Sequence, residues 1–268
     1  MPSPPLVVQF RISHYNEKVR WALDHKRWPH RRRALVPGWH FLTARRLSGQ
    51  TKLPILELDG RVVSDSTAII AELERLRPEP PLYPADPADR ARALAIEDYF
   101  DEVVAPEVRR LFWSCYLDRT LACARMTTAG RGALSRLAFA TSFPIVRPLF
   151  RRNMGIDTER VANARARLPG FFDRLESELQ PSGFLVGDRF SIADLTAAAV
   201  MSGIIRPPQF SYPLPEPWPQ ELVDLRGSVS HRAGFQWVLG IYQRHRGASC
   251  EITDDARYLD DHHGRATG

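Results

Sequence analysis

The sequence predicts a small α/β domain with a mixed sheet, followed by an all-helical domain. Three observations predict this architecture. Strand and helix patterns alternate over residues 6–76, a proline-rich stretch covers residues 78–84, and helical periodicity dominates the rest of the chain. With 268 residues, 44% of them hydrophobic and 25% charged, the chain has the composition of a globular protein and can bury a sizeable core.

The α/β domain begins with an apolar run at residues 6–10 that suits a buried strand. Apolar residues then recur at helical spacing, which predicts a helix over residues 14–26. A second strand is expected at residues 33–36, and residues 39–47 are expected to form a short helix or an irregular segment.

A hairpin and a helix complete this domain. An Asp-Gly pair separates two short apolar runs, residues 55–58 and 61–64, and such a pair between such runs is a strong hairpin signal. Ser64 or Asp65 then caps a helix with an apolar face. The order of elements predicts a thioredoxin-like layout, with a central mixed sheet and helices on both sides.

The second domain is predicted to be helical throughout. Long helices are expected at residues 89–117 and 157–179, the second kinked at Pro169, and further helices at Ser191 and around Phe235. Six prolines over residues 206–219 predict a meandering loop. The predicted boundaries are a first domain at 1–78, a linker at 79–88, a helical domain at 89–246 with a basic insert at about 119–157, and a disordered tail at 247–268.

Composition excludes several classes of function. Cys115, Cys123 and Cys250 are widely spaced and form no CxxC pattern, so we expect neither a disulfide scaffold nor a metal site. The net charge of +6 comes almost entirely from arginine without a nucleic-acid motif, so no nucleic-acid partner is expected. The chain shows neither a signal peptide nor a run of about 20 apolar residues, which favours the cytoplasm.

Four motifs, taken together, resemble the cytosolic glutathione transferase superfamily over most of residues 6–246. They are Ser13 ahead of Lys18-Val19-Arg20-Trp21-Ala22-Leu23, Leu53-Pro54, Asp65-Ser66, and Gly187-Asp188-Arg189-Phe190-Ser191-Ile192-Ala193-Asp194. The last is similar to the family's helix-capping signature and is the most specific. The resemblance implies a glutathione transferase fold, with a thioredoxin-like N-terminal domain that binds glutathione and an all-α C-terminal domain.

The resemblance also implies two glutathione contacts. The peptide bond before the proline matching Pro54 is cis in the family, which exposes the backbone of Leu53 to the cysteinyl part of glutathione. Ser66 and its N–H would hold the γ-glutamyl carboxylate at a helix N-terminus, where free N–H groups favour an anion. Asp65 would answer the amino group. Without the other motifs, an ordinary strand-start proline and a plain helix cap would be the simpler interpretations.

Ser13 matches the position at which related enzymes carry a catalytic Ser or Cys. A hydroxyl that donates to the glutathione sulfur, aided by the helix dipole, would favour the thiolate over a thiol of pKa about 8.5. The sequence departs from the family here, with His14 in place of the usual proline and Asn16 where a resolving cysteine can stand. His14, Tyr15 and Asn16 therefore remain alternative thiol contacts.

Four further residues complete the predicted glutathione and acceptor sites. His40 and Lys52 are candidates for the glycyl carboxylate of glutathione, and Phe112 and Tyr116 are candidates for the hydrophobic acceptor pocket. Ser191 and Asp194 are expected to form a reciprocal structural cap at a helix start.

The basic insert is unusual, because residues 119–167 carry ten Arg against Asp157 and Glu159. It can cover the active site, extend a dimer, or lie on an anionic membrane surface. We expect a solvated helical elaboration and no membrane contact.

The predicted activity is transfer of glutathione, as co-substrate, to a hydrophobic alkyl or aryl electrophile by a homodimer. A glutathione-dependent isomerase, lyase or dehalogenase would use the same site, and a non-catalytic binding protein of the same fold is the rival outside enzymology. A thiol–disulfide reductase is disfavoured, because neither Ser13 nor Asn16 supplies a cysteine.

Overall fold

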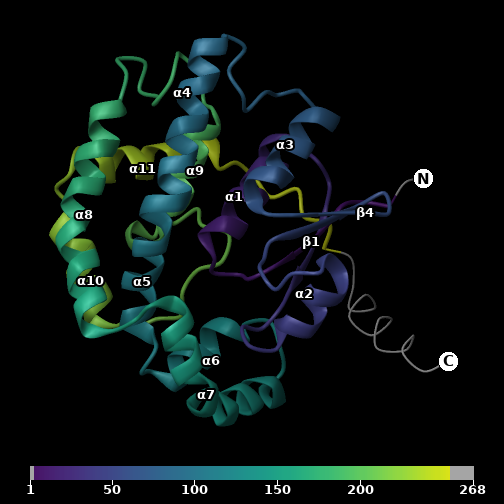
Figure 1. Cartoon of the computed structure of the whole chain (residues 1–268), viewed down its shortest axis with the longest axis vertical. Helices are drawn as coiled ribbons and strands as arrows, with labels where there is room; N and C mark the ends of the chain where they lie inside the picture. Colours follow the sequence, from purple (N-terminus) through teal and green to yellow (C-terminus); the bar gives the residue numbers. More distant parts are fainter. Residues whose placement is uncertain (1–2, 254–268) are drawn as a thin grey trace.

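The computed structural model describes residues 3–253, in which a small sheet domain lies beside a larger helical domain (Figure 1). The strands are β1 (Leu6–Gln9), β2 (Arg31–Ala34), β3 (Ile55–Leu58) and β4 (Arg61–Ser64). They form one sheet in the order β2-β1-β3-β4. The pair β1–β2 is parallel, whereas β1–β3 and β3–β4 are antiparallel. This mixed sheet confirms the predicted thioredoxin-like domain.

Alternation along β1 explains why helices cover both faces of the sheet. Val7 joins the main hydrophobic cluster together with side chains of α1 (His14–His25) and α3 (Ser66–Leu76). The next residue, Val8, joins a separate small cluster with Ala44 of α2 (His40–Ser48). Successive strand side chains point to opposite faces, so one strand anchors both layers.

The predicted hairpin is confirmed at its expected residues, but the second strand is displaced. We expected residues 33–36, whereas β2 occupies Arg31–Ala34. It is an edge strand whose four residues are all half-buried, and Arg32 pairs with Asp24 at 2.8 Å. Because arginines paired in this way replace apolar residues, the strand leaves no apolar run in the sequence.

Helices build the second domain. Their bounds are α4 (Pro87–Asp98), α5 (Ala105–Tyr116), α6 (Thr120–Thr127), α7 (Ala133–Met154), α8 (Thr158–Glu178), α9 (Ile192–Ile205), α10 (Gln220–Val229) and α11 (Ala233–His245). A π-helical segment, η1 (Tyr99–Val104), separates α4 from α5, so the single helix predicted at 89–117 is corrected to three pieces. Pro106 supplies the physical reason: it has no N–H for the carbonyl four residues earlier, and its ring clashes there.

Three further expectations for this domain are met, and one helix was not expected. Helix α8 agrees with the predicted 157–179, the insert is helical, and the proline-rich residues 206–219 form a loop. Helix α10 was not predicted, because its short pattern follows directly on the prolines. In the part of the chain that is described, no helix has the length and apolarity needed to cross a bilayer.

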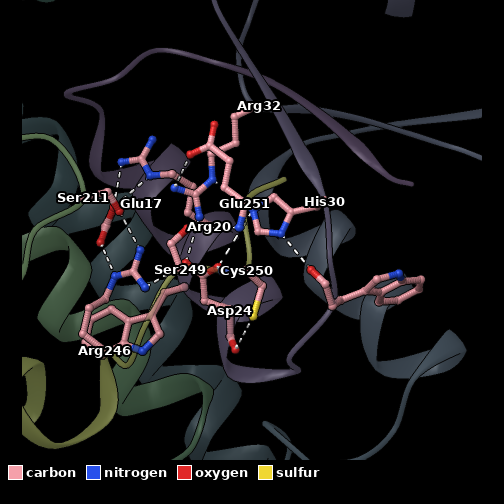
Figure 2. A network of polar contacts seen from close by, with 12 residues as sticks. Glu17, Arg20, Asp24, His30, Arg32, Ser211, Arg246, Ser249, Cys250 and Glu251 are labelled. Carbon is pink, nitrogen blue, oxygen red and sulfur yellow. Dashed lines mark hydrogen bonds and ion pairs between the residues drawn. The ribbon is translucent and has the colours of Figure 1, made fainter. Parts of the chain in front are cut away.

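The domains meet through a buried ionic network that also holds the end of the described chain (Figure 2). Arg246, just after α11, donates to Glu17 at 2.7 Å and to Asp24 at 2.8 Å, both on α1. The Cys250 N–H donates to Asp24 at 2.7 Å, and the Ile252 N–H donates to the His30 carbonyl at 2.8 Å. The predicted disordered tail is therefore wrong for residues 247–253, and its remainder, residues 254–268, lies outside the described residues.

Candidate functional site

The strand registers bring the ends of three strands to one edge of the sheet. Val8 of β1 pairs with Ile55, and Ile55 pairs with Ser64 of β4, both in antiparallel ladders. The end of β1, the start of β3 and the end of β4 therefore share this edge. The three N-terminal motifs lie close to these strand ends. Ser13 follows β1, Leu53-Pro54 precedes β3, and Asp65-Ser66 follows β4, so the fold brings them to one edge.

The Leu53–Pro54 peptide bond is cis. The Leu53 side chain is 8% exposed and packs with Val8 and Ile55, whereas its backbone lies just ahead of β3. Neither strand ladder uses the Leu53 N–H or C=O. The backbone of this residue can therefore pair with an extended ligand. Lys52 is exposed, and its N–H donates to the Gln50 side chain at 2.6 Å.

Asp65 has a positive φ of 82°, which a residue with a side chain rarely adopts. Its carboxylate caps α3 by accepting from the N–H groups of Thr67 at 3.0 Å and Ala68 at 3.2 Å. Backbone strain of this kind persists where the surroundings impose it, often at ligand clamps. Ser66 is buried at the first position of the same helix.

The four candidates for thiol contact differ in what their polar atoms already do. Ser13 precedes α1, and its hydroxyl makes no capping hydrogen bond. The His14 Nε2 is buried without a partner among the described residues. The Tyr15 hydroxyl instead donates to the Asp101 carbonyl at 2.9 Å. Asn16 is wholly buried, and neither of its amide atoms has a partner in residues 3–253.

The pKa shifts separate these candidates further. Burial, with the nearby charges of Arg109 and Lys18, lowers the pKa of His14 to about 3, so the ring is neutral at pH 7. Burial raises the pKa of Tyr15 to about 12, which keeps its phenol protonated. Ser13, neutral His14 and Asn16 thus have uncommitted polar atoms at the start of α1, and Asn16 is the most deeply buried of the three.

His40 is a poorer candidate for a carboxylate contact than the sequence suggested. It is buried, its Nδ1 accepts from the Gly38 N–H at 3.1 Å, and its ring lies against Phe10 with centroids 4.7 Å apart. Burial lowers the pKa of His40, so it offers no positive charge at neutral pH.

A buried charge cluster behind α3 went unnoticed in the sequence. Lys18 Nζ donates to Glu97 at 2.6 Å, to Thr67 at 3.1 Å, and to Asp101. One oxygen of each carboxylate, Glu97 Oε2 and Asp101 Oδ1, is buried without a partner in the described part of the chain. Burial raises the pKa of Glu97 despite the neighbouring Lys18. The only sequence signal was a lysine set among apolar residues of the first helix.

Phe112 and Tyr116, predicted to line an acceptor pocket, are both buried in the second hydrophobic cluster. Their rings stack with centroids 5.0 Å apart. The Tyr116 hydroxyl has no partner among residues 3–253, and burial raises its pKa to about 12. Within the described residues the structure thus places both side chains in a packed apolar cluster, in which this hydroxyl is a buried polar group.

Arg206, which the sequence analysis did not single out, lies beside Phe112 of that cluster. It is 6% exposed, and within the described residues it forms no ion pair. Its guanidinium lies 4.3 Å from the Phe210 ring centroid and 5.9 Å from that of Phe112, and it donates to the Tyr212 carbonyl at 3.3 Å. Burial lowers its pKa to about 10, which leaves it charged at pH 7. A buried cation without a counter-ion is costly unless an anion joins it.

The insert lies against the same edge of the sheet. Arg131, between α6 and α7, donates to the Ala34 carbonyl at 2.9 Å, and Arg11 donates to the Ala129 carbonyl. The ring of Trp39 faces Phe139 of α7, with centroids 6.5 Å apart. Figure 1 shows α6 and α7 next to α2 at this end of the molecule. The insert therefore borders the sheet edge at which the three N-terminal motifs lie.

The predicted structural cap is present. Asp194 accepts from the Ser191 N–H at 2.9 Å, from the Ser191 hydroxyl at 3.0 Å, and from the Leu185 N–H at 2.8 Å. The reciprocal capping box opens α9, as the signature predicts.

Two shallow hollows lie elsewhere, between the end of α7 and the start of α8. Ile156, Asp157 and Arg151 line both of them, and none of the predicted site residues does. Residues 3–253 contain no group of three or more His, Cys, Asp and Glu side chains placed to hold a metal ion.

The fold and site define a thioredoxin-like two-domain protein. Its four-stranded mixed sheet presents a cis-proline and a helix start at one edge, and a helical domain packs beside it. Two family matches name it more closely. Residues 7–81 match the N-terminal domain of glutathione S-transferases, and residues 158–219 match their C-terminal domain. Together these matches cover about half of the chain. The protein belongs to the glutathione S-transferase superfamily.

The chain is also similar to individual curated proteins. The chain is 39% identical over 62 residues, 23% of its own length, to a probable maleylacetoacetate isomerase 1 of Drosophila melanogaster. The chain matches only a quarter or less of the length of the curated relatives.

Solved structures support the fold alone. Beta-etherase LigF from Sphingobium sp. strain SYK-6 has a TM-score of 0.60 at 21% identity, covering 89% of this chain and 99% of that one. The theta class glutathione S-transferase of Xanthomonas axonopodis pv. citri, with glutathione bound, has a TM-score of 0.55 at 21% identity, covering 93% and 100%.

Proposed function

We propose that this protein is a glutathione transferase that binds glutathione at the sheet edge and activates its thiol for attack on an electrophile. The observation that carries the proposal is the Leu53 backbone, outside both strand ladders, at the same sheet edge as the Asp65–Ser66 helix start. Leu53 offers unused backbone groups to the cysteinyl part, and the α3 N-terminus offers N–H groups to the γ-glutamyl carboxylate. Asp65 has a second carboxylate oxygen for the amino group, and Lys52 is the exposed candidate for the glycyl carboxylate.

Ser13 would hold the thiolate. Its uncommitted hydroxyl at the start of α1 can donate to the sulfur, and the helix dipole favours negative charge there. A hydrogen bond to a charged group contributes about 1.5–3 kcal/mol, which corresponds to roughly 10–100-fold in thiolate population. Neutral His14 is the alternative donor, because its Nε2 has no partner among the described residues.

The test is turnover of a generic aryl halide with glutathione, together with calorimetric binding. Ser13→Ala is expected to lower kcat/KM by roughly 10–100-fold and to raise the thiol pKa in the pH–rate profile. Its binding of glutathione should change little. Ser228→Ala, an exposed serine on α10, is the matched control. No binding at several millimolar glutathione would refute the function, whereas full activity of Ser13→Ala would transfer the role to His14.

The acceptor is proposed to carry an anionic group on the same conjugated system as its electrophilic atom. Arg206 supports this idea, because a buried guanidinium without a carboxylate partner is stabilised by a bound anion. The probes are 4-chloro-3-nitrobenzoate and its methyl ester, which share one reactive centre. Arg206→Met should lose activity on the acid and keep it on the ester, whereas Arg206→Lys should retain part of the activity on the acid and all of that on the ester. Equal losses on both probes would exclude the anion contact.

Glutathione-dependent cis–trans isomerisation is the second candidate. The likeness to a probable maleylacetoacetate isomerase favours it, as does the buried Arg206, which forms no ion pair within residues 3–253. The thiolate would add to a conjugated cis-alkene carboxylate, allow rotation and leave again, so glutathione is not consumed. Substoichiometric glutathione would therefore support complete conversion of such an alkene, but only one turnover per glutathione in a conjugation. A homodimer in the cytoplasm is the proposed working form, which light scattering and cell fractionation would test.

A further inference from the structure

Helix α7 has one face packed in the protein and one face that is exposed within residues 3–253. Phe139 and Phe143 are each 2% exposed and stack on one another in the second hydrophobic cluster. On the other side, Leu134 is 80% exposed, Leu137 61% and Ile145 81%. Leu134 and Ile145 are 11 residues apart, three turns of an α-helix, so they share the outward face.

Further apolar side chains extend this surface. Leu149 lies one turn after Ile145 and is 57% exposed, and Leu121 on neighbouring α6 is 68% exposed. Single exposed leucines are ordinary in soluble proteins, but a contiguous set on one helix marks a surface that another phase or molecule covers. We call Leu134, Leu137, Ile145 and Leu149 the outer face of α7.

The charge of α7 decides what covers it. Its 22 residues contain four arginines and no Asp or Glu. Arg147 and Arg151 pair with Asp118, at 3.5 Å and 2.8 Å. Arg136 and Arg152 are exposed and form no ion pair within residues 3–253. The outer face is thus apolar and bordered by unneutralised positive charge.

We propose that the outer face of α7 docks on membrane surfaces that carry anionic headgroups. The leucines and the isoleucine would enter the boundary between headgroups and acyl chains, while Arg136 and Arg152 pair with lipid phosphates. A second copy of this chain fits less well. A two-fold pairing of the same faces would bring like charges together, with no acidic side chain on α7 to compensate. This surface does not depend on the proposed chemistry.

Co-sedimentation with vesicles tests the proposal, using pure phosphatidylcholine and a 3:1 mixture with phosphatidylglycerol. The full chain should bind the mixed vesicles at low salt, should bind them several-fold less at 0.5 M salt, and should ignore pure phosphatidylcholine. Ile145→Asp should reduce binding to the mixed vesicles by about tenfold, and Arg136→Glu with Arg152→Glu by at least about tenfold, since each surface cation contributes roughly fivefold.

Val223→Asp is the matched control, because Val223 is an exposed apolar residue of α10, 43% exposed, and should not affect vesicle binding. Melting temperatures of all variants should stay near that of the unaltered chain, since the substituted side chains are exposed. Absence of binding to the mixed vesicles, or equal binding by Ile145→Asp, would overturn the proposal. Self-association that Ile145→Asp abolishes, without any vesicle binding, would assign the face to a second copy instead.

Discussion

Helix α1 carries two buried charge clusters, and they are built in opposite ways. Around Glu17 and Asp24, every carboxylate oxygen has a partner: Arg246, Arg20 and Ser211 at Glu17, and Arg246, Arg32 and the Cys250 N–H at Asp24 (Figure 2). Around Lys18, one cation serves two carboxylates, and one oxygen of Glu97 and one of Asp101 have no partner in the described residues.

The pKa values follow from this difference in pairing. Burial alone would raise the pKa of Glu17, but Arg246 and Arg20 outweigh it and lower that pKa to about 2. At Glu97 burial wins, and the pKa rises. The cluster around Glu17 and Asp24, which we call the saturated cluster, holds the two domains and the end of the described chain together. The cluster around Lys18, Glu97 and Asp101, which we call the unsaturated cluster, contacts Thr67 at the start of α3, where the proposed ligand carboxylate binds.

The largest expected effect is that of breaking the saturated cluster. Arg246→Met removes the cation shared by Glu17 and Asp24 and leaves Glu17 Oε1 without a partner among the described residues, so breaking this buried pair should cost about 3–5 kcal/mol in the free energy of unfolding. Urea denaturation measures it. Arg174→Met, which breaks a half-exposed pair with Glu178, should cost less than about 1 kcal/mol. Similar midpoints for the two variants would contradict the distinction between the clusters.

Acid, like the Arg246→Met substitution, should lower the stability that the saturated cluster provides. Glu17 binds a proton more readily in the unfolded chain, where its pKa is about 4.5, than in the folded one, where it is about 2. Its stabilising contribution is therefore present above pH 4.5 and is lost as the pH falls toward 2, by on the order of 3 kcal/mol. Denaturation midpoints measured between pH 2 and 5, compared for the unaltered chain and Glu17→Gln, report it. Parallel curves for the two proteins would show that Glu17 does not contribute.

Breaking the unsaturated cluster should cost less. Lys18→Met leaves Glu97 and Asp101 without their cation, but Glu97 has a raised pKa and can take up a proton, so we expect a loss of about 2 kcal/mol. Adding Glu97→Gln to Lys18→Met should recover part of it, which a double-mutant cycle measures. Glutathione binding should weaken as well, since Lys18 positions Thr67. A loss equal to that of Arg246→Met, with no recovery, would make the two clusters equivalent.

The sequence predicts the elements of this fold better than it predicts the polar chemistry between them. Local patterns are sufficient for the hairpin, α1 and α8, because hydrophobic spacing decides those elements. The cis bond before Pro54 came from family resemblance, since no local signal distinguishes it. The Lys18 cluster joins residues 79 and 83 positions apart, and Arg206 follows an apolar helix in a loop, so their burial depends on tertiary packing. The functional roles of the candidate site residues stay predictions for the same reason.

Asp194 provides the smallest and most discriminating test, because it is a third buried carboxylate whose partners are all neutral. Three donors satisfy both oxygens, yet without a cation burial raises its pKa to about 6. Its pH dependence should oppose that of Glu17. The folded chain holds the Asp194 proton more tightly than the unfolded one, so the associated stability is present below pH 4 and is lost as the pH rises through 6.

Asp194→Ala should cost about 0.5–2 kcal/mol at pH 7, the usual range for a lost helix cap. Urea midpoints compared at pH 4.5 and 7 measure both effects, with Asp188→Ala, an exposed aspartate of the same signature, as control. An unchanged midpoint for Asp194→Ala would show that hydrogen-bond saturation without a cation contributes nothing, and that the charge of Arg246 alone separates the two clusters on α1.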